Sequence, residues 1–542
     1  MWCSSCCPCS STSKRRTVRK RLDRSRKSNK PRIITMHTTV SGFIAAHADD
    51  APALGSPTAA WLSYGGLREL STNVRDALHG FGIGRGDRVA IVLPNGPEMA
   101  ASFITVAQVA VTAPLNPAYR EDEYVFYLED LQAKALMVMA GDEGPAVAAA
   151  RRLNIAILRV SVPDGADAGR FELSSDATGQ ADTAAPGPDD VALILHTSGT
   201  TSRPKIVPLL QSNVAASAEH IRASLDLTPK DRCMNVMPLF HIHGLLAAVS
   251  ATLAAGASVW CTPGFDALKF FGWMRDAKPT WYTAVPTMHQ AILTRAGRNA
   301  EIIENVPLRF LRSSSASLPA QVMHALTETF GAPVIEGYGM TEAAHQMASN
   351  PLPPRAQKPG AVGIEAGPKV RIAHEIEDRL TEGTGEVVIS GPNVTPGYEG
   401  NPEANAKSFF EADGDRWFRT GDQGAFDEDG YLHLTGRLKE IINRGGEKIS
   451  PLEVDGVLLD HPAIAQVVTF ALPHPKLGEE VAAAVVLKAE ATERDIRNFA
   501  AERMADFKVP RKVIILDEIP KGATGKMQRI GMAEKLGLVE SA

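Results

Sequence analysis

Two patterns of apolar residues alternate along most of the chain, one typical of strands and one typical of helices. Short apolar runs, such as residues 88–94 (RVAIVLP) and 135–140 (ALMVMA), alternate with stretches of helical periodicity, such as residues 98–109. Short apolar runs are typical of strands, and apolar residues spaced three or four positions apart are typical of helices. Because strands that alternate with helices form parallel sheets covered by helices, the sequence predicts an α/β fold.

The same alternation continues in the middle of the chain, at residues 258–262, 280–286 and 310–316. Each of these apolar runs ends in small or polar residues. Open α/β sheets bind ligands beyond the carboxyl ends of their parallel strands, so we expect a binding site there. Residues 161–190 are rich in Gly, Asp, Ala, Thr and Pro, and we expect them to form a long surface excursion.

A different pattern starts after Gly383. Short β runs separated by turn residues occur at residues 385–391, 416–422 and 430–437. This spacing predicts an antiparallel sheet or a β-barrel-like subdomain that closes the large domain.

The C-terminal part has a separate, small α+β pattern. It contains two predicted helices, residues 451–459 and 493–504, and a predicted strand, residues 482–488. We place the boundary near Lys439. The expected architecture is therefore a large N-terminal domain of stacked α/β sheets, residues 36–438, and a small α+β domain, residues 439–542.

Length and composition exclude a single-core protein and argue against a membrane span. The 542 residues exceed what one hydrophobic core supports, and the 44% hydrophobic content is ample for several. Residues 100–115 come nearest to a membrane span, but four polar residues interrupt them, which favours a buried helix. With no apolar segment for secretion and no peroxisomal Ser-Lys-Leu at the C-terminus, we expect a cytoplasmic protein.

Basic residues and cysteines are concentrated in residues 1–35. This segment holds eleven Lys or Arg and one acidic residue, so the rest of the chain carries a net charge of about −15. It also holds four of the six cysteines, Cys3, Cys6, Cys7 and Cys9. The two cysteines that remain in the rest of the chain are too few for a disulfide framework. We expect a disordered basic tail upstream of a second start at Met36. A transit peptide, zinc or lipid attachment and attraction to nucleic acid stay open, although the acidic body argues against a dedicated nucleic-acid binder.

Residues 196–208 (HTSGTTSRPKIVP) combine five hydroxyl residues, one glycine and two cations directly after an apolar run. The backbone N–H groups and hydroxyls of such a loop can converge on a phosphate while Lys205 supplies positive charge. The loop is not a Walker loop, because no Gly-Lys-Ser/Thr follows at the right spacing. Taken alone, it is also compatible with an ordinary turn between a strand and a helix.

Four further motifs follow this loop, at residues 337–342 (GYGMTE), 419–422 (RTGD), 436–455 and 520–526 (PKGATGK). In this order the five motifs resemble the phosphate loop, the adenine and magnesium motif, the ribose-binding aspartate, the hinge and the C-terminal catalytic lysine of the adenylate-forming superfamily. That superfamily includes acyl-CoA synthetases, luciferases and peptide-synthetase adenylation domains. The resemblance extends from about residue 40 to the C-terminus. It implies that ATP and Mg²⁺ activate a carboxylic acid, and that a mobile C-terminal domain then rotates about Lys439 to admit coenzyme A.

The resemblance also implies roles for particular residues. A carboxylate that attacks the α-phosphorus of ATP meets like-charge repulsion, so cations are needed where negative charge accumulates. The resemblance implies catalytic roles for Lys526, Thr197, Glu342 and His241, with Glu342 as the magnesium ligand. The residues implied to bind the nucleotide or coenzyme A are Thr197, Ser198, Gly199, Thr200, Thr201, Lys205, Ser315, Ala316, Ser317, Gly337, Tyr338, Gly339, Thr341, Asp422, Arg437, Lys439, Gly445 and Gly446.

The nature of the acid is indicated by the four segments that match the acyl pocket of similar enzymes, residues 238–245, 282–290, 313–317 and 341–347. Here those segments carry six polar residues, His241, His243, His289, Ser313, Ser314 and His345. A long apolar tail would gain nothing from this polarity, whereas a small buried carboxylate needs donors or cations. The segments resemble those of oxalate-CoA ligases most, including Ser202 where most relatives have glycine. Oxalate is therefore the expected acid.

Other functions stay open on the sequence. The acid could be of medium-chain, aryl or malonyl type, and a luciferase-like oxygenase is compatible with the same fold. A non-catalytic adenylate-binding protein is suggested by Ile206, which stands where a glycine usually follows the loop lysine. A carrier-loading adenylation domain is disfavoured because no carrier segment accompanies the chain.

Overall fold

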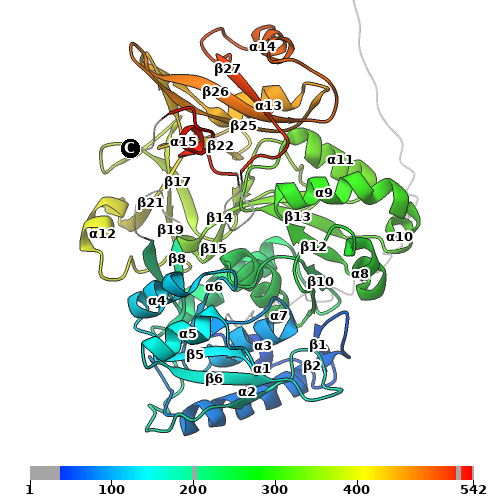
Figure 1. Cartoon of the computed structure of the whole chain (residues 1–542), viewed down its shortest axis with the longest axis vertical. Helices are drawn as coiled ribbons and strands as arrows, with labels where there is room; N and C mark the ends of the chain where they lie inside the picture. The colour runs from blue at the N-terminus through cyan, green and yellow to red at the C-terminus, as the bar shows by residue number, and fades with distance from the viewer. Residues whose placement is uncertain (1–36, 198–203, 521–526, 540–542) are drawn as a thin grey trace, which may run out of the picture. The chain divides into compact units, whose positions relative to one another are not determined.

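The computed structural model describes residues 37–197, 204–520 and 527–539. Within these residues the strands form four sheets, of nine, seven, six and five strands (Figure 1). Residues Met36–Ala542 form one compact unit.

The nine-stranded sheet has the order β16-β15-β14-β13-β12-β10-β11-β1-β2. The six strands from β14 to β1 in this order are parallel, and β2, β15 and β16 pair antiparallel with their neighbours. The strands are β1 (Pro52–Gly55), β2 (Leu62–Ser63), β10 (Arg232–Asn235), β11 (Ser258–Cys261), β12 (Trp281–Ala284), β13 (Phe310–Ser314), β14 (Val334–Met340), β15 (His345–Ser349) and β16 (Ile364–Glu365).

The seven-stranded sheet has the order β7-β6-β5-β3-β4-β8-β9, and only its edge strands β7 and β9 are antiparallel to their neighbours. Its strands are β3 (Arg88–Val92), β4 (Val111–Pro114), β5 (Ala135–Met139), β6 (Ala156–Ser161), β7 (Glu172–Ser174), β8 (Val191–Thr197) and β9 (Lys205–Leu210). The predicted parallel α/β architecture is confirmed by these two sheets.

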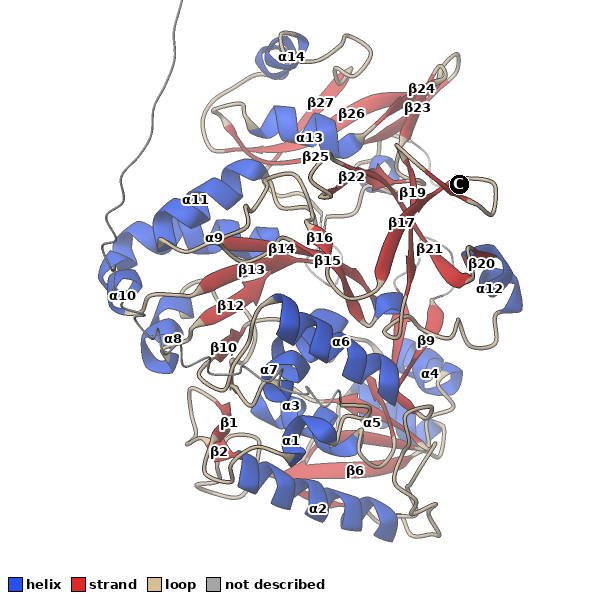
Figure 2. Cartoon of the chain, turned by 180° about the vertical axis from the view of Figure 1, so that it is seen from behind, coloured by secondary structure: helices blue, strands red, loops and turns tan. Residues whose placement is uncertain are grey.

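Helices cover both faces of the nine-stranded sheet. Neighbouring residues of a strand point to opposite faces. Accordingly, Tyr282 packs with Phe270 of α8 and Leu326 of α11, whereas Trp281 packs with Ile221 of α6 and Ala247 of η1. Figure 2 shows α11 and α6 on opposite sides of this sheet. The helices up to residue 343 are α1 (Gly42–Ala45), α2 (Tyr64–Gly80), α3 (Pro97–Val106), α4 (Glu121–Asp130), α5 (Pro145–Arg152), α6 (Gln211–Ser224), the π-helix η1 (His243–Ser250), α7 (Ala251–Ala254), α8 (Phe270–Ala277), α9 (Pro286–Ala296), η2 (Gly297–Asn299), α10 (Ala300–Asn305), α11 (Ala320–Phe330) and η3 (Thr341–Ala343).

The six-stranded sheet is antiparallel throughout, as the β runs after Gly383 predict. It contains β17 (Lys369–Ala373), β18 (Leu380–Thr381), β19 (Gly385–Ser390), β20 (Phe409–Ala412), β21 (Asp415–Phe426) and β22 (Leu432–Arg437), and α12 (Pro402–Ser408) lies between β19 and β20 in sequence. This sheet is the expected barrel-like subdomain.

The five-stranded sheet consists of strands that all follow Lys439 in the chain. Its long hairpin of β25 and β26 pairs from Ile464↔Leu487 to His474↔Gly478. The elements are β23 (Ile442–Arg444), β24 (Glu447–Ile449), α13 (Pro451–Leu459), β25 (Ile464–His474), β26 (Gly478–Leu487), α14 (Glu493–Ala501), β27 (Lys512–Leu516) and α15 (Met532–Lys535).

Local sequence explains where the helices of this small sheet begin. The Ser450 hydroxyl accepts a hydrogen bond from the Glu453 N–H at 3.2 Å, and Pro451 occupies the first turn of α13. Thr492 and Asp495 form a capping box at the start of α14. Both arrangements satisfy N–H groups that the first helical turn leaves without a backbone partner. The prediction for α13 is confirmed at both ends, whereas α14 ends three residues before the expected Met504.

Residues 196–208, which contain the predicted phosphate loop, do not form a turn between a strand and a helix. The chain leaves β8 and returns in β9, which pairs antiparallel with β8 from Val191↔Leu210 to Thr197↔Lys205. Helix α6 starts only at Gln211. The segment therefore joins two strands, not a strand and a helix.

Ile206 has a regular place in β9, opposite His196 of β8. Its side chain is half-buried against an apolar cluster that includes Ile194, and its carbonyl accepts a hydrogen bond from the Glu399 N–H at 3.1 Å. An extended strand residue does not need the conformational freedom of glycine.

No helix in residues 37–197, 204–520 and 527–539 has the length and apolar character that crossing a bilayer requires.

Candidate active site

Lys205, at the start of β9, is held by an aromatic ring from a distant part of the chain. Its Nζ lies 4.2 Å from the centroid of the Tyr398 ring. Burial lowers the pKa of Lys205, and the nearby carboxylate of Glu342 opposes that shift. Thr197 pairs with Lys205 across the hairpin. The predicted site residues Ser198, Gly199, Thr200, Thr201 and Lys526 lie outside the described residues.

Glu342 lies in η3, immediately after β14, and is 6% exposed. Its Oε1 accepts a hydrogen bond from the Tyr398 hydroxyl at 2.8 Å. Burial raises the pKa of Glu342, whereas Tyr398, Arg437 and Lys205 act in the opposite direction. Tyr398 thus contacts both the cation and the carboxylate of the site.

The backbone directly after Glu342 is strained. Ala344 has φ +46° and His345 has φ +101°, and bulky residues rarely adopt a positive φ. This turn reverses the chain from β14 into β15, which pairs antiparallel with it through a bulge at Tyr338 and Gly339. Strain of this kind persists where surrounding structure enforces it and is concentrated at functional sites.

Asp422 of β21 is buried between an aromatic hydroxyl and a guanidinium. It accepts a hydrogen bond from the Tyr338 hydroxyl at 2.5 Å and pairs with Arg437 Nε at 3.1 Å. Arg437 stands opposite Asp422 in the β21–β22 register, and Asp422 raises its pKa. The adenine-motif tyrosine, the ribose-motif aspartate and the hinge-motif arginine therefore meet.

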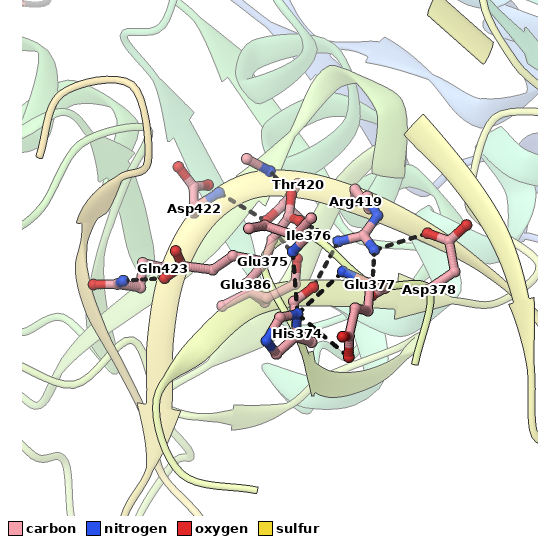
Figure 3. Close-up of polar contacts among 12 residues, drawn as sticks. His374, Glu375, Ile376, Glu377, Asp378, Glu386, Arg419, Thr420, Asp422 and Gln423 are labelled. Atoms are coloured by element: carbon pink, nitrogen blue, oxygen red, sulfur yellow. Dashed lines mark hydrogen bonds and ion pairs between the residues drawn. The ribbon is translucent and has the colours of Figure 1, made fainter. Parts of the chain in front are cut away.

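The strand segment before Asp422 is anchored by polar contacts (Figure 3). The Asp422 N–H donates to the Thr420 hydroxyl at 3.1 Å, and that hydroxyl donates to the Val387 carbonyl at 2.7 Å. Arg419 pairs with Glu386 at 2.6 Å and with Asp378 at 2.9 Å. These contacts fix the backbone that presents Asp422.

A second polar group lies where η1, β12, β13 and β15 meet. His243 Nδ1 lies 3.0 Å from the Ser315 hydroxyl, and His243 Nε2 lies 2.6 Å from the Thr283 hydroxyl. The ring centroids of His243 and His345 are 5.1 Å apart. Ser315 has φ +76°, another strained backbone position.

The other predicted pocket residues have different surroundings. His289 is fully buried, with its ring nitrogens 3.1 Å from the Tyr282 hydroxyl and 3.2 Å from the Arg312 carbonyl. Burial lowers its pKa to about 4, so its ring is neutral. The structure does not bring His289 to His243, because Tyr282 and Thr283 point to opposite faces of the sheet. His241 is half-buried beside the Phe240 ring.

The remaining predicted residues are close to these groups in sequence. The Ser314 hydroxyl donates to the Gly337 carbonyl at 2.6 Å, and Ser313 is buried with no partner for its hydroxyl among the described residues. Thr341 is half-buried beside Glu342 and Gly339 is half-buried in β14. Residues with exposed side chains or backbone are Ala316, Ser317, Lys439, Gly445 and Gly446.

Comparisons with known proteins fit this geometry. The family model described as AMP-binding enzyme matches residues 43–399, and the model of the AMP-binding enzyme C-terminal domain matches residues 453–526. The chain belongs to the AMP-binding enzyme family.

Named members of the family resemble this chain along most of its length. An oxalate–CoA ligase of Arabidopsis thaliana is 48% identical over 85% of this chain and 90% of its own length, and one of Saccharomyces cerevisiae is 41% identical over 87% and 90%. The structure of ATP-bound MatB from Rhodopseudomonas palustris matches with a TM-score of 0.82 and 29% identity, over 92% of this chain and 99% of that one. The resemblance found in the sequence is thereby confirmed, and this AMP-binding enzyme is an ATP-dependent, AMP-forming CoA ligase.

Tyr398 and Arg312 are two residues near these groups that the motifs did not indicate. Tyr398 lies in a Gly- and Pro-rich segment before α12, with nothing beside it in sequence to suggest a contact with Glu342. Arg312 interrupts the apolar run of β13, and a charged residue in a buried strand is itself a signal because such residues are seldom fully buried.

We expect Tyr398→Phe to lower the rate of acid-dependent pyrophosphate release by about 2- to 13-fold, because the variant loses one hydrogen bond, which contributes about 0.5–1.5 kcal/mol. The ring under Lys205 is retained. Tyr431→Phe is the matched control, since Tyr431 also lies under a lysine, Lys358 at 4.4 Å, and donates to the Ala356 carbonyl at 2.8 Å. Equal rates for the two variants would contradict a role of Tyr398 in positioning Glu342.

Proposed function

We propose that this CoA ligase uses oxalate as its acid, forming oxalyl-AMP and then oxalyl-CoA. The observation that supports the proposal is the polar group His243, Ser315, Thr283 and His345 in segments that match the acyl pocket of the family. Burying a small dianion requires such hydrogen-bond donors. An alkyl or aryl acid would leave these buried polar groups without hydrogen bonds, which costs binding free energy. The oxalate–CoA ligases among the relatives support the same acid.

In the first step, a carboxylate oxygen of the acid attacks the α-phosphorus of ATP. The bond from that phosphorus to the bridging oxygen breaks, and pyrophosphate leaves. Lys205 provides positive charge near Glu342, and Asp422 would accept hydrogen bonds from the ribose hydroxyls while Arg437 orients it. We propose Lys526, outside the described residues, as a second cation for this step and His241 as a residue lining the acid.

Glu342 is suited to hold a magnesium ion. Mg²⁺ prefers oxygen ligands and uses one or two protein carboxylates together with phosphates and water. Glu342 is a single buried carboxylate oriented by Tyr398, with Lys205 close enough to influence its pKa. The ion would neutralise charge on the triphosphate.

In the second step, the thiol of coenzyme A attacks the acyl carbon, the bond from that carbon to AMP breaks, and the thiol proton passes to solvent. We propose that the small domain rotates about Lys439 between the steps, so that Gly445 and Gly446 approach the pantetheine arm. The rotation would break the ion pair between Lys448 and Glu375, 2.7 Å long. Both groups are partly exposed, and such pairs stabilise weakly.

The substrate is tested with the full chain, ATP, Mg²⁺, coenzyme A and a panel of oxalate, malonate, acetate, octanoate and coumarate. We expect kcat/KM for pyrophosphate release and thioester formation to be highest with oxalate. A higher value with malonate, octanoate or coumarate would replace oxalate by the malonyl, medium-chain or aryl alternative. Nucleotide binding without pyrophosphate release for any acid would favour the non-catalytic alternative.

A further inference from the structure

Arg312 is a fully buried cation in the middle of β13, with 0% exposure. Its position in the strand pairs with Thr283 of β12 and Ile335 of β14. It therefore projects from the sheet face that α6 and η1 cover, the same face as Thr283.

The guanidinium contacts the side chains of a histidine, a threonine and a glutamine. Nη1 lies 3.4 Å from His243 Nε2 and 3.5 Å from the Thr283 hydroxyl, both long for hydrogen bonds. Nη2 donates to Gln346 Oε1 at 3.1 Å. Nε has no hydrogen-bond partner among the described residues, although it is buried.

No carboxylate of the described residues neutralises this charge. Glu336 of the neighbouring strand stands opposite Ser313, so it points to the other face, where its Oε1 accepts from the Leu318 N–H at 2.9 Å. The Cys233 thiol is near enough to influence Arg312, but burial raises the pKa of that thiol, which keeps it neutral. Burial lowers the pKa of Arg312 to about 10, so the guanidinium is still charged at neutral pH.

A buried charge without a counterion is costly, and a bound ligand of opposite charge would offset that cost. The groups around Arg312 indicate where that ligand would lie. His243 also contacts Ser315 and lies beside His345, and Gln346 follows His345 in β15. Gly337 belongs to the adenine motif, and a Cβ on it would come within 2.6 Å of Arg312 Nη2.

We propose that Arg312 binds the second carboxylate of a dicarboxylic acid and so determines the substrate selectivity of the enzyme. The inference rests on the proposed function, in which one carboxylate of the acid reacts with ATP. The other carboxylate would face the unpartnered Nε and the adjacent Nη, because a planar guanidinium presents two parallel donors to a carboxylate.

The test compares acids that have the same shape and differ in one charge. Oxalate and oxamate form one pair, and malonate and its monoamide form another. In the pair that contains its better substrate, we expect the wild-type enzyme to have a higher kcat/KM for the dicarboxylate than for the monoamide. Arg312→Met should reduce the dicarboxylate-to-monoamide ratio of kcat/KM by roughly 30-fold or more, as loss of one partner of a buried charge pair does. Arg312→Lys, which keeps the charge but not the planar fork, should retain part of the preference.

The ratio separates a binding role from a structural one, because a folding defect lowers activity toward both acids of a pair equally. Arg309→Gln is the matched control, since Arg309 directly precedes β13 and already pairs with Asp231 at 3.0 Å. It should leave the ratio unchanged. In a thermal melt, the preferred dicarboxylate should stabilise the wild type and not Arg312→Met.

The two proposals fail in different ways. An unchanged ratio in Arg312→Met, or a wild-type enzyme that prefers monoamides, would overturn the role of Arg312. A wild-type preference for malonate over oxalate, with the ratio still dependent on Arg312, would overturn oxalate and leave the dicarboxylate site intact.

Discussion

Glu342→Gln is expected to slow acid-dependent pyrophosphate release by about 100- to 1,000-fold, the range seen when one electrostatic group is removed from a reacting centre. The substituted amide has the size of the carboxylate and its oxygen still accepts from Tyr398, so the fold around η3 is kept. What is lost is the negative charge that would hold Mg²⁺ against the triphosphate. Initial rates measured over a series of Mg²⁺ concentrations should show a higher Mg²⁺ requirement as well as a lower maximum.

Glu365→Gln is the control for this experiment, because Glu365 is an exposed carboxylate that pairs with Arg371. It should leave both the rate and the Mg²⁺ requirement unchanged. If Glu342→Gln slowed the reaction with an unaltered Mg²⁺ requirement, Glu342 would not be the metal ligand.

Asp422→Asn is expected to raise the KM for ATP by roughly 100-fold. The ribose would offer two hydrogen bonds, of which the amide oxygen can still accept one, and the lost bond to a charged group contributes about 1.5–3 kcal/mol. The change also removes the partner of Arg437, whose side chain is 51% exposed and can be solvated by water. The main loss should therefore appear in nucleotide binding, with the melting temperature little altered.

Asp415→Asn provides the comparison on the same strand, because Asp415 begins β21 and pairs with Lys369 at 2.6 Å near the surface. Titration of each variant with ATP, followed by calorimetry, measures the difference directly. Similar affinities for the two variants would remove Asp422 from the nucleotide site.

Most of the fold was predictable because its strands and helices have local patterns. The apolar runs at β3, β5 and β11 to β13 and the capped helix α13 can be recognised within a few residues of sequence. The pairing direction of β9 was not predictable in this way, since it depends on contacts with β8 and with Glu399 far along the chain. Pairing of edge strands is decided by tertiary contacts that no short window contains.

Some residues of the candidate site could likewise be predicted from local sequence, and others could not. Tyr338, Glu342 and Asp422 belong to contiguous motifs, so their sequence neighbours identify them. Tyr398 becomes interesting only when folding brings it to Glu342, 56 residues away, and beneath Lys205. For Arg312 the sequence held a usable signal, a cation within an apolar strand, but its missing counterion is apparent only in three dimensions.

The π-helix η1 begins at His243, the residue that links Ser315, Thr283 and Arg312. Its turns are wider than those of an α-helix, and deleting one residue would return them to α-helical spacing. Side chains on either side of the deletion would then turn by about 100° relative to each other. Because the proposed acid site includes His243, an insertion or deletion in η1 would be expected to change the acid preference as strongly as a point substitution.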